Sequence, residues 1–184
     1  QRTLLPHAED LRIVGGAPKG MKGTDGLRTA ERKPRTRFFM NEMQLKFLSR
    51  SENEVFARNV VAAFALPLGP TLSELSDVKT AVSEAVTNCI VHGYRGGEGW
   101  ITLVCRTEGA SLHIEISDSG RGIDDLEKAL TPFYTTLPDE ERSGMGFTIM
   151  QTFMSDFSVL SETGKGTTVR MSKQFGAKAA EDAR

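Results

Sequence analysis

Segments with helical periodicity follow one another in this sequence, and segments with strand periodicity come in pairs. Residues 72–92 repeat apolar side chains every three or four positions, as a helix with one buried face does. Residues 111–117 alternate instead, so that Leu112, Ile114 and Ile116 share one side of a strand. Helices in runs and strands in hairpins predict an α+β fold. We expect a two-layer sandwich, in which helices cover one face of a mixed, mostly antiparallel sheet.

The expected elements run in the order strand, helix, helix, strand, strand, helix, strand, strand. They cover residues 43–49, 52–66, 72–92, 100–106, 111–117, 145–154, 157–161 and 167–172, and a short helical piece is expected at 124–130. Ser51 is followed three residues later by Glu54, which is a capping-box pattern for the first helix. The second helix is expected to reach His92 without a break.

Charge and composition divide the chain near residue 40. Residues 1–39 carry a net charge of +5 and are rich in Gly, Pro and basic residues, whereas residues 40–184 carry −6. The first segment is expected to be a disordered tail or a non-native extension, with Met40 as a natural first residue. Its basic cluster at 31–37 could alternatively contact nucleic acid or an acidic partner. Residues 40–175 are expected to form one domain, and residues 176–184 a flexible C-terminal tail.

Other features favour a cytoplasmic protein. No apolar run approaches the roughly 20 residues that span a bilayer, and no signal-peptide segment is recognisable. The two cysteines, Cys89 and Cys105, lie in apolar contexts and are expected to be reduced core thiols. We therefore expect no contact with a membrane.

A carboxylate ends the alternating strand. Continuing the count from Ile116 places Asp118 on the core-facing side, where a carboxylate must be hydrogen-bonded. It could cap the turn that contains Gly120 and Gly122 by accepting from backbone N–H groups. It could equally accept a hydrogen bond from the amine of a buried ligand. The strand alone leaves both interpretations open.

Two further segments have the residue types of a phosphate site. Glu84 and Asn88 are four apart on one helix edge, which suits either a solvated edge or a magnesium-phosphate site. Gly144 and Gly146 open the helix at 145–154, where the first N–H groups could bind phosphate. Each signal is weak by itself. The segment 163–168 lacks the spacing of a Walker loop, and the glycines after Asp118 lack that of a dinucleotide fold.

The order of these motifs resembles that of a known superfamily. Glu84…Asn88, Asp118-x-Gly120-x-Gly122, Gly144-x-Gly146 and Gly164-x-Gly166-Thr167-Thr168 resemble the N, G1, G2 and G3 boxes of the GHKL (Bergerat) ATPases. The longer stretches "SRSENEVFAR", "SEAVTNCIVHGY" and 133–156 resemble the anti-sigma F factors of endospore-forming bacteria. This resemblance extends over essentially all of residues 40–175.

The resemblance implies a serine protein kinase that uses ATP and Mg²⁺. It implies that Glu84 is the general base, that Arg142 lies near the γ-phosphate, and that Asn88 holds magnesium. Asp118 is expected to accept from the adenine 6-amino group, and Thr168 to support Asp118 or a water beside the adenine. The remaining residues expected to contact the nucleotide are Gly120, Gly122, Ile123, Thr135, Thr136, Ser143, Gly144, Met145, Gly146 and Phe147.

The resemblance also implies protein partners. These are a sigma factor of the sporulation type, an anti-anti-sigma protein that is phosphorylated on serine, and a second copy of the chain in a homodimer. No direct contact with nucleic acid is implied. Glu54 and Arg58 match positions that contact partners in the family and are expected to point outward, although they could be an ordinary surface ion pair.

Three other functions remain to be distinguished. One is an anti-sigma kinase of the general stress response, and another is a nucleotide-regulated binding module without kinase activity, which the presence of Glu84 disfavours. A histidine-kinase catalytic domain needs a phosphoacceptor histidine on a dimerisation helix. The three histidines, His7, His92 and His113, do not lie on such a helix.

Overall fold

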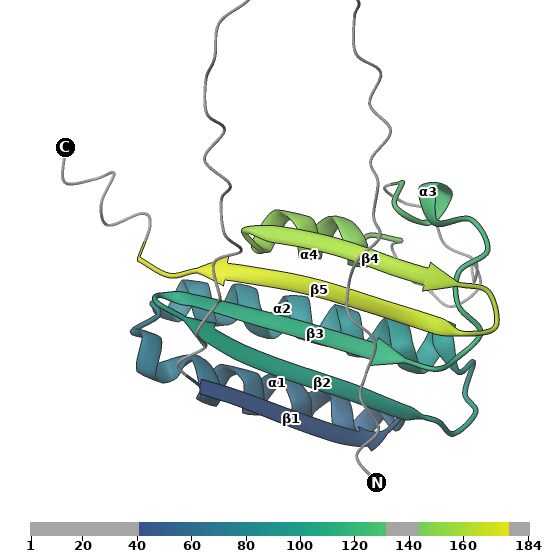
Figure 1. The fold of residues 1–184 in the computed structure, drawn as a ribbon, viewed down its shortest axis with the longest axis horizontal. Coiled ribbons are helices and arrows are strands. Elements are labelled where there is room, and N and C mark those ends of the chain that lie inside the picture. Colours follow the sequence, from purple (N-terminus) through teal and green to yellow (C-terminus); the bar gives the residue numbers. More distant parts are fainter. Residues whose placement is uncertain (1–40, 132–143, 177–184) are drawn as a thin grey trace, which may run out of the picture. The chain divides into compact units, whose positions relative to one another are not determined.

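A computed structural model describes residues 41–131 and 144–176 of the 184-residue chain (Figure 1). The described elements are β1 (Asn41–Leu48), α1 (Ser51–Ala65), η1 (Leu66–Leu68), α2 (Leu72–Asn88), η2 (Cys89–Gly93), β2 (Trp100–Glu108), β3 (Ser111–Asp118), α3 (Leu126–Ala129), α4 (Gly146–Phe153), β4 (Asp156–Glu162) and β5 (Gly166–Gln174). The N-terminal tail proposed for 1–39 and nearly all of the C-terminal tail proposed for 176–184 lie outside the described residues.

The strands form one five-stranded sheet in the order β1-β2-β3-β5-β4. All four pairings between the described strands are antiparallel, so the parallel pairing that a mixed sheet would contain is not found among them. α1, α2 and α4 lie together on one face of the sheet (Figure 1). The predicted α+β, two-layer architecture is confirmed.

The core lies between the helices and the inner face of the sheet. Alternate residues of β3, namely Leu112, Ile114 and Ile116, are at most 2% exposed, as the sequence pattern predicted. The helical layer contributes mostly small and β-branched side chains to the same core, which are Ala57, Val61, Ala65, Val78, Ala81, Val82, Ala85 and Val86. Cys89 and Cys105 are both buried and free, as expected.

The predicted capping box of α1 is wrong. Ser51 is already the first helical residue, and Arg50, which precedes it, makes no side-chain cap. A capping side chain must belong to the extended residue before the helix, so Ser51 lies one position too late. The box is found in α2 instead, where Thr71 Oγ1 accepts from Glu74 N at 3.2 Å and Thr71 N donates to Glu74 Oε2 at 2.7 Å.

The second helix does not reach His92 as a uniform α-helix. Its α-helical part ends at Asn88, and Cys89–Gly93 form a π-helical turn, η2, in which Tyr94 N donates to Cys89 O at 3.0 Å. Single π turns of this kind are often found at functional sites. No helix in the described part of the chain is long and apolar enough to cross a membrane.

Candidate nucleotide-binding site

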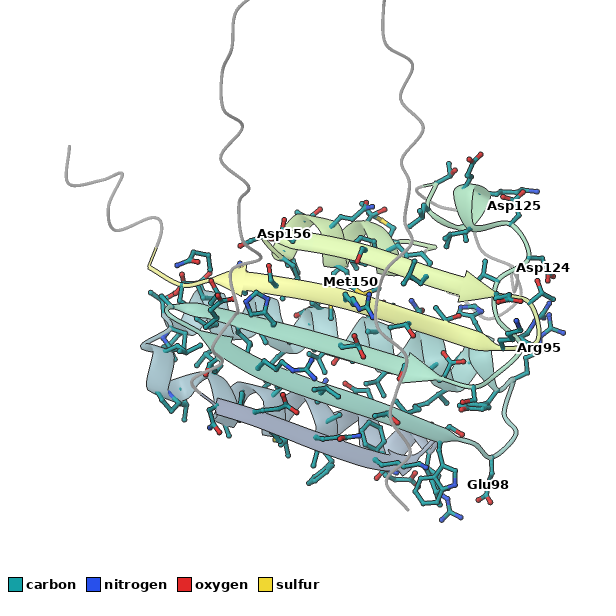
Figure 2. The ribbon with its side chains drawn as sticks, viewed as in Figure 1. Arg95, Glu98, Asp124, Asp125, Met150 and Asp156 are labelled. Atoms are coloured by element: carbon teal, nitrogen blue, oxygen red, sulfur yellow. The ribbon has the colours of Figure 1, made fainter. Side chains whose placement is uncertain are left out.

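A cavity of about 380 Å³ opens at the end of the sheet where β3 stops. This volume is within the usual range for small-molecule sites. The cavity is lined by Glu84, Ala85, Thr87, Asn88, Cys89, His92, Gly93, Asp118, Arg121, Gly122, Ile123, Asp124, Asp125, Ala129, Gly144, Met145, Gly146, Phe147, Thr167 and Val169. Figure 2 shows Asp124 and Asp125 beside α3, near the end of β4. Segments from all four sequence motifs therefore meet at one cavity.

Glu84 and Asn88 meet the start of α4 in this cavity. A Cβ atom added to Gly146 would lie 2.9 Å from Glu84 Oε2 and 3.5 Å from Asn88 Oδ1. The missing side chain thus lets the first turn of α4 approach the carboxylate and the carboxamide closely. Because the first N–H groups of a helix attract anions, this arrangement places an anion-attracting helix end beside a carboxylate and a carboxamide. The solvated-edge interpretation of Glu84 and Asn88 is therefore incomplete.

Asp118 also lines the cavity and is buried, with only 8% of its surface exposed. Its Oδ1 accepts from Gly120 N at 2.8 Å. Burial raises the pKa of Asp118, and the interactions with Gly120, Cys89 and Thr167 act in the opposite direction. Asp118 caps the turn, as the first interpretation predicted, and it also lines the cavity, whereas its hydrogen bond to a ligand amine stays a prediction.

The turn after Asp118 is packed tightly against two other segments. A Cβ at Gly120 would lie 2.3 Å from Gly93 O, and one at Gly122, where φ is +70°, would lie 2.1 Å from Glu162 O. Arg121 N donates to Gly93 O at 3.0 Å. Gly120 itself does not line the cavity, so its role is to hold the turn against η2. Gly122 and Ile123 do line it, as predicted.

The prediction for Thr168 is wrong by one residue. Thr167 lines the cavity, and its Oγ1 lies 2.9 Å from Ser161 Oγ. Side chains alternate along β5, so Thr167 shares the helix-facing side with Val169, which is 2% exposed. Thr168 consequently points to the other face. Counting parity backwards from Val169 in the sequence would have identified Thr167.

The G2 segment is only partly described. Gly144, Met145, Gly146 and Phe147 line the cavity, and the Phe147 ring packs against Phe157 with centroids 5.9 Å apart. Their contact with a nucleotide stays a prediction. The predicted contacts of Thr135, Thr136, Arg142 and Ser143 lie outside the described residues. The sequence reasoning missed Cys89, Gly93 and Arg121 as cavity residues, since none belongs to a motif position.

The residues available for a metal are few. In the ranges 41–131 and 144–176 there is no group of three or more His, Cys, Asp or Glu side chains that could hold an ion. The carboxamide oxygen of Asn88 lies beside Glu84 at this cavity. Such a donor set fits Mg²⁺ that is bound chiefly through phosphate oxygens and water, rather than a metal held in a protein cage.

Glu54 and Arg58 form an ion pair, which was one of the two expectations for them. They do not both point outward, as the other expectation required. Arg58 Nη1 lies 3.3 Å from Glu54 Oε1 and 3.2 Å from Ser83 Oγ, and the Ser83 hydroxyl also donates to Glu54. The Glu54 side chain is only 16% exposed, because α2 covers it. Whether either residue contacts a partner stays a prediction.

Comparison with known proteins agrees with this geometry. Residues 47–173 match the histidine kinase-like ATPase domain family. The fold and the site therefore define a GHKL-type ATPase domain. Among solved structures, the RsbU and RsbW domains of a Mycobacterium tuberculosis protein share the fold, with a TM-score of 0.54 and 17% identity over 73% of this chain and 32% of that chain.

Closer relatives identify the family within this class. The anti-sigma F factor of Thermoanaerobacter sp. (strain X514) is 57% identical over 76% of this chain and 97% of its own length. That of Caldanaerobacter subterraneus subsp. tengcongensis is 56% identical over 75% of this chain and 96% of its own length. The chain belongs to the anti-sigma F factor family.

Proposed function

We propose that this protein binds a sigma factor and phosphorylates an anti-anti-sigma protein on serine with ATP. The observation that supports this most strongly is the contact of Gly146 with Glu84 and Asn88 at the cavity wall. It brings a carboxylate, a carboxamide and a helix N-terminus together in a cavity that the buried carboxylate of Asp118 also lines. The names of the relatives suggest the sigma-factor partner.

The residues at the cavity suit phosphoryl transfer. Catalysis of this reaction depends mainly on positioning and on charge neutralisation, so no covalent enzyme intermediate is needed. Glu84 would accept the proton of the substrate serine as the serine oxygen forms its bond to the γ-phosphorus and the bond to the β–γ bridging oxygen breaks, which releases ADP. Arg142 would place a cation near the transferred group. When bound through Asn88, Mg²⁺ would neutralise phosphate charge.

The part of the cavity around Asp118 would select the base of the nucleotide. An ionised Asp118 can only accept hydrogen bonds, so it suits the 6-amino group of adenine and repels the 6-carbonyl oxygen of guanine. Thr167, whose hydroxyl lies beside that of Ser161, would support the same end. The chain is therefore expected to prefer ATP and ADP to the guanine nucleotides.

The biological setting is also proposed. The closer similarity to anti-sigma F factors than to the RsbW domain favours a sporulation sigma factor over the general stress response. We propose that the protein acts as a homodimer in the cytoplasm. A binding module without kinase activity is the second candidate, and it is disfavoured because Glu84 reaches the cavity.

The decisive experiment separates nucleotide binding from phosphoryl transfer. Glu84→Gln keeps the size of the side chain but removes the base, so ATP affinity should stay within about threefold while transfer to the anti-anti-sigma protein falls by at least about 100-fold. Glu98→Gln, in the exposed loop before β2, is the matched control and should retain transfer. Undiminished transfer by Glu84→Gln would remove Glu84 from its role.

A pull-down tests the partner assignment. The wild-type protein is offered a sporulation sigma factor, a general-stress sigma factor and an anti-anti-sigma protein, with ATP and then with ADP. Binding of the sporulation sigma factor and a change of partner with the nucleotide are expected. Selective capture of the general-stress sigma factor would favour the alternative pathway, and transfer-free binding would favour the module without kinase activity.

A further inference from the structure

The two ends of α4 are held near two different parts of α2. At the N-terminal end, a Cβ added to Gly146 would lie 2.9 Å from Glu84 Oε2. At the C-terminal end, Lys173 Nζ of β5 donates to Phe153 O at 2.5 Å and to Asp77 Oδ2 at 2.9 Å. The two helices therefore run in opposite directions. One ammonium group joins the last residue of α4 to the first half of α2.

The spacing of these contacts is the same on both helices. Asp77 and Glu84 are seven residues apart on α2. Gly146 and Phe153 are also seven residues apart on α4. Seven residues make nearly two turns and rise about 10 Å, so Asp77 and Glu84 lie on one side of α2. The distance between the contacts at the two ends of α4 therefore matches the distance between their partners on α2.

Lys173 reaches its acceptors from the helix-facing side of the sheet. It shares strand parity with Val169 and Met171, which are 2% and 3% exposed. The Lys173 side chain itself is only 15% exposed. A cation in such a place must be paired, because its removal from water is costly. The ion pair with Asp77 meets this need, and the hydrogen bond to Phe153 O adds a connection to α4.

The orientation of α4 depends on contacts of this kind. The helix has eight residues, and a helix this short is not stable without tertiary packing. Met150 is the one buried residue among these eight, and Met145, which precedes them, makes no side-chain cap. The last carbonyl groups of a helix have no partners within it, and a lysine that donates to one of them also interacts favourably with the helix dipole. Lys173 therefore fixes the end of α4 that lies away from Glu84.

We propose that Lys173 is a positioning residue for phosphoryl transfer. Together with Asp77 it holds the C-terminal end of α4 on α2, and this keeps the N-terminal turn of α4 beside Glu84. The inference rests on the proposed kinase function. Lys173 acts through α4, because the residue that it contacts is at the opposite end of that helix from Gly146. A displacement of about 1 Å can lower a catalytic rate about 100-fold, so a contact two turns away can affect transfer.

The part of the cavity around Asp118 should not respond to Lys173. In the sheet Lys173 pairs with Leu112 of β3, whereas Asp118 is at the other end of that strand. The bonds of Lys173 go to α2 and α4 and not to the turn after Asp118. Loss of the ammonium group should therefore affect the terminal phosphates of a bound nucleotide and leave recognition of the base unchanged.

The test uses the full chain and matched variants. Lys173→Met removes the ammonium group but keeps the length of the side chain, and Lys173→Arg keeps a donor. Asp77→Asn removes only the charge of the partner. The control is Arg170→Met, which removes an ion pair with Glu115 on the opposite face of the same strand. Urea unfolding shows whether each variant is folded. The probes are ATP and AMP, which lacks the two terminal phosphates.

Lys173→Met should bind ATP roughly fivefold more weakly. Its transfer to the anti-anti-sigma protein at saturating ATP should fall about tenfold or more. Its affinity for AMP should stay within about twofold of the wild type, because distant sites act independently. Asp77→Asn should show a smaller loss of the same kind. Lys173→Arg and Arg170→Met should match the wild type.

Equal losses for ATP and AMP would indicate a general loosening of the fold and would overturn the inference. Unchanged ATP affinity and transfer in Lys173→Met would overturn it too. If Lys173→Met does not fold, the contrast between ATP and AMP in Asp77→Asn decides in its place. A wild type that binds ATP but transfers no phosphate would instead refute the proposed function, and the comparison of ATP with AMP would still test the role of Lys173.

Discussion

Replacement of Gly120 by Ala tests the packing of the turn after Asp118. The Cβ of the new alanine would lie 2.3 Å from Gly93 O, 2.5 Å from Gly93 C and 2.9 Å from Asp118 Oδ1. Two of these atoms belong to the backbone and cannot rotate away. Because Gly120 does not have a positive φ, alanine meets no conformational penalty there, and the effect is one of space alone.

The magnitude follows from the contacts that must be broken. The turn and η2 must separate by about 1 Å to reach ordinary contact distances. That movement disrupts the bonds from Gly120 N to Asp118 Oδ1 and from Arg121 N to Gly93 O, which are 2.8 and 3.0 Å long. Two hydrogen bonds at about 1 kcal/mol each and an overpacking cost of about 1–3 kcal/mol predict a loss of about 3–5 kcal/mol in the free energy of unfolding.

Urea unfolding and ATP titration measure the two consequences. ATP affinity should fall by at least about tenfold, because Asp118 moves with the turn. Gly109→Ala in the β2–β3 hairpin is the control, since its φ is +59° but no atom lies within 4 Å of the added Cβ. It should lose about 1–2 kcal/mol of stability and no ATP affinity. If Gly120→Ala is within 0.5 kcal/mol of the wild type, as an ordinary surface substitution would be, the steric argument is refuted.

Three further predictions concern caps, parity and charge. Thr71→Ala should lower the free energy of unfolding by about 1 kcal/mol, whereas Ser51→Ala should change it by less than about 0.5 kcal/mol; the reverse order would contradict the capping assignment. Thr167→Val should weaken ATP binding severalfold by titration, while Thr168→Val leaves it within about twofold, because only Thr167 faces the cavity. ATP affinity should decline as pH falls toward the raised pKa of Asp118, whose protonation removes the acceptor, and Asp118→Asn should flatten this decline. A profile that is unchanged in Asp118→Asn would refute the last prediction.

The sign of the Asp118 effect on stability is opposite to its effect on binding. A raised pKa means that the folded state binds the proton more tightly than the unfolded state. Stability from this group is therefore fully present below the unfolded value of 3.8 and is lost as pH rises through the folded value. At neutral pH the ionised Asp118 is kept at a cost in stability, as is common for groups at functional sites.

The sequence predicted the elements and most motif residues because their signals are local. Alternation in β3 placed Asp118 on the buried side, and helical spacing placed Glu84 and Asn88 on one edge of α2. The predicted capping box of α1 was wrong because the Ser–x–x–Glu pattern does not indicate which residue is the last extended residue before the helix. Glu54 was expected to face outward, but α2 covers it. The sequence of α1 alone could not predict this burial, because it depends on how α2 packs against α1. Thr168 was assigned from the resemblance when strand parity would have indicated Thr167.

Periodicity and motif order therefore determined the two-layer fold, the family resemblance and the chemical groups of the site. These depend on residues within a few positions of one another, whose geometry the helix and the strand fix. Only the tertiary structure showed that Gly146 lies on Glu84 and Asn88 and that Gly120 packs on Gly93. Such contacts join segments between 27 and 62 positions apart in the chain. These contacts form because the helices pack against the sheet. A local sequence pattern cannot predict them, since it describes only residues within a few positions of one another.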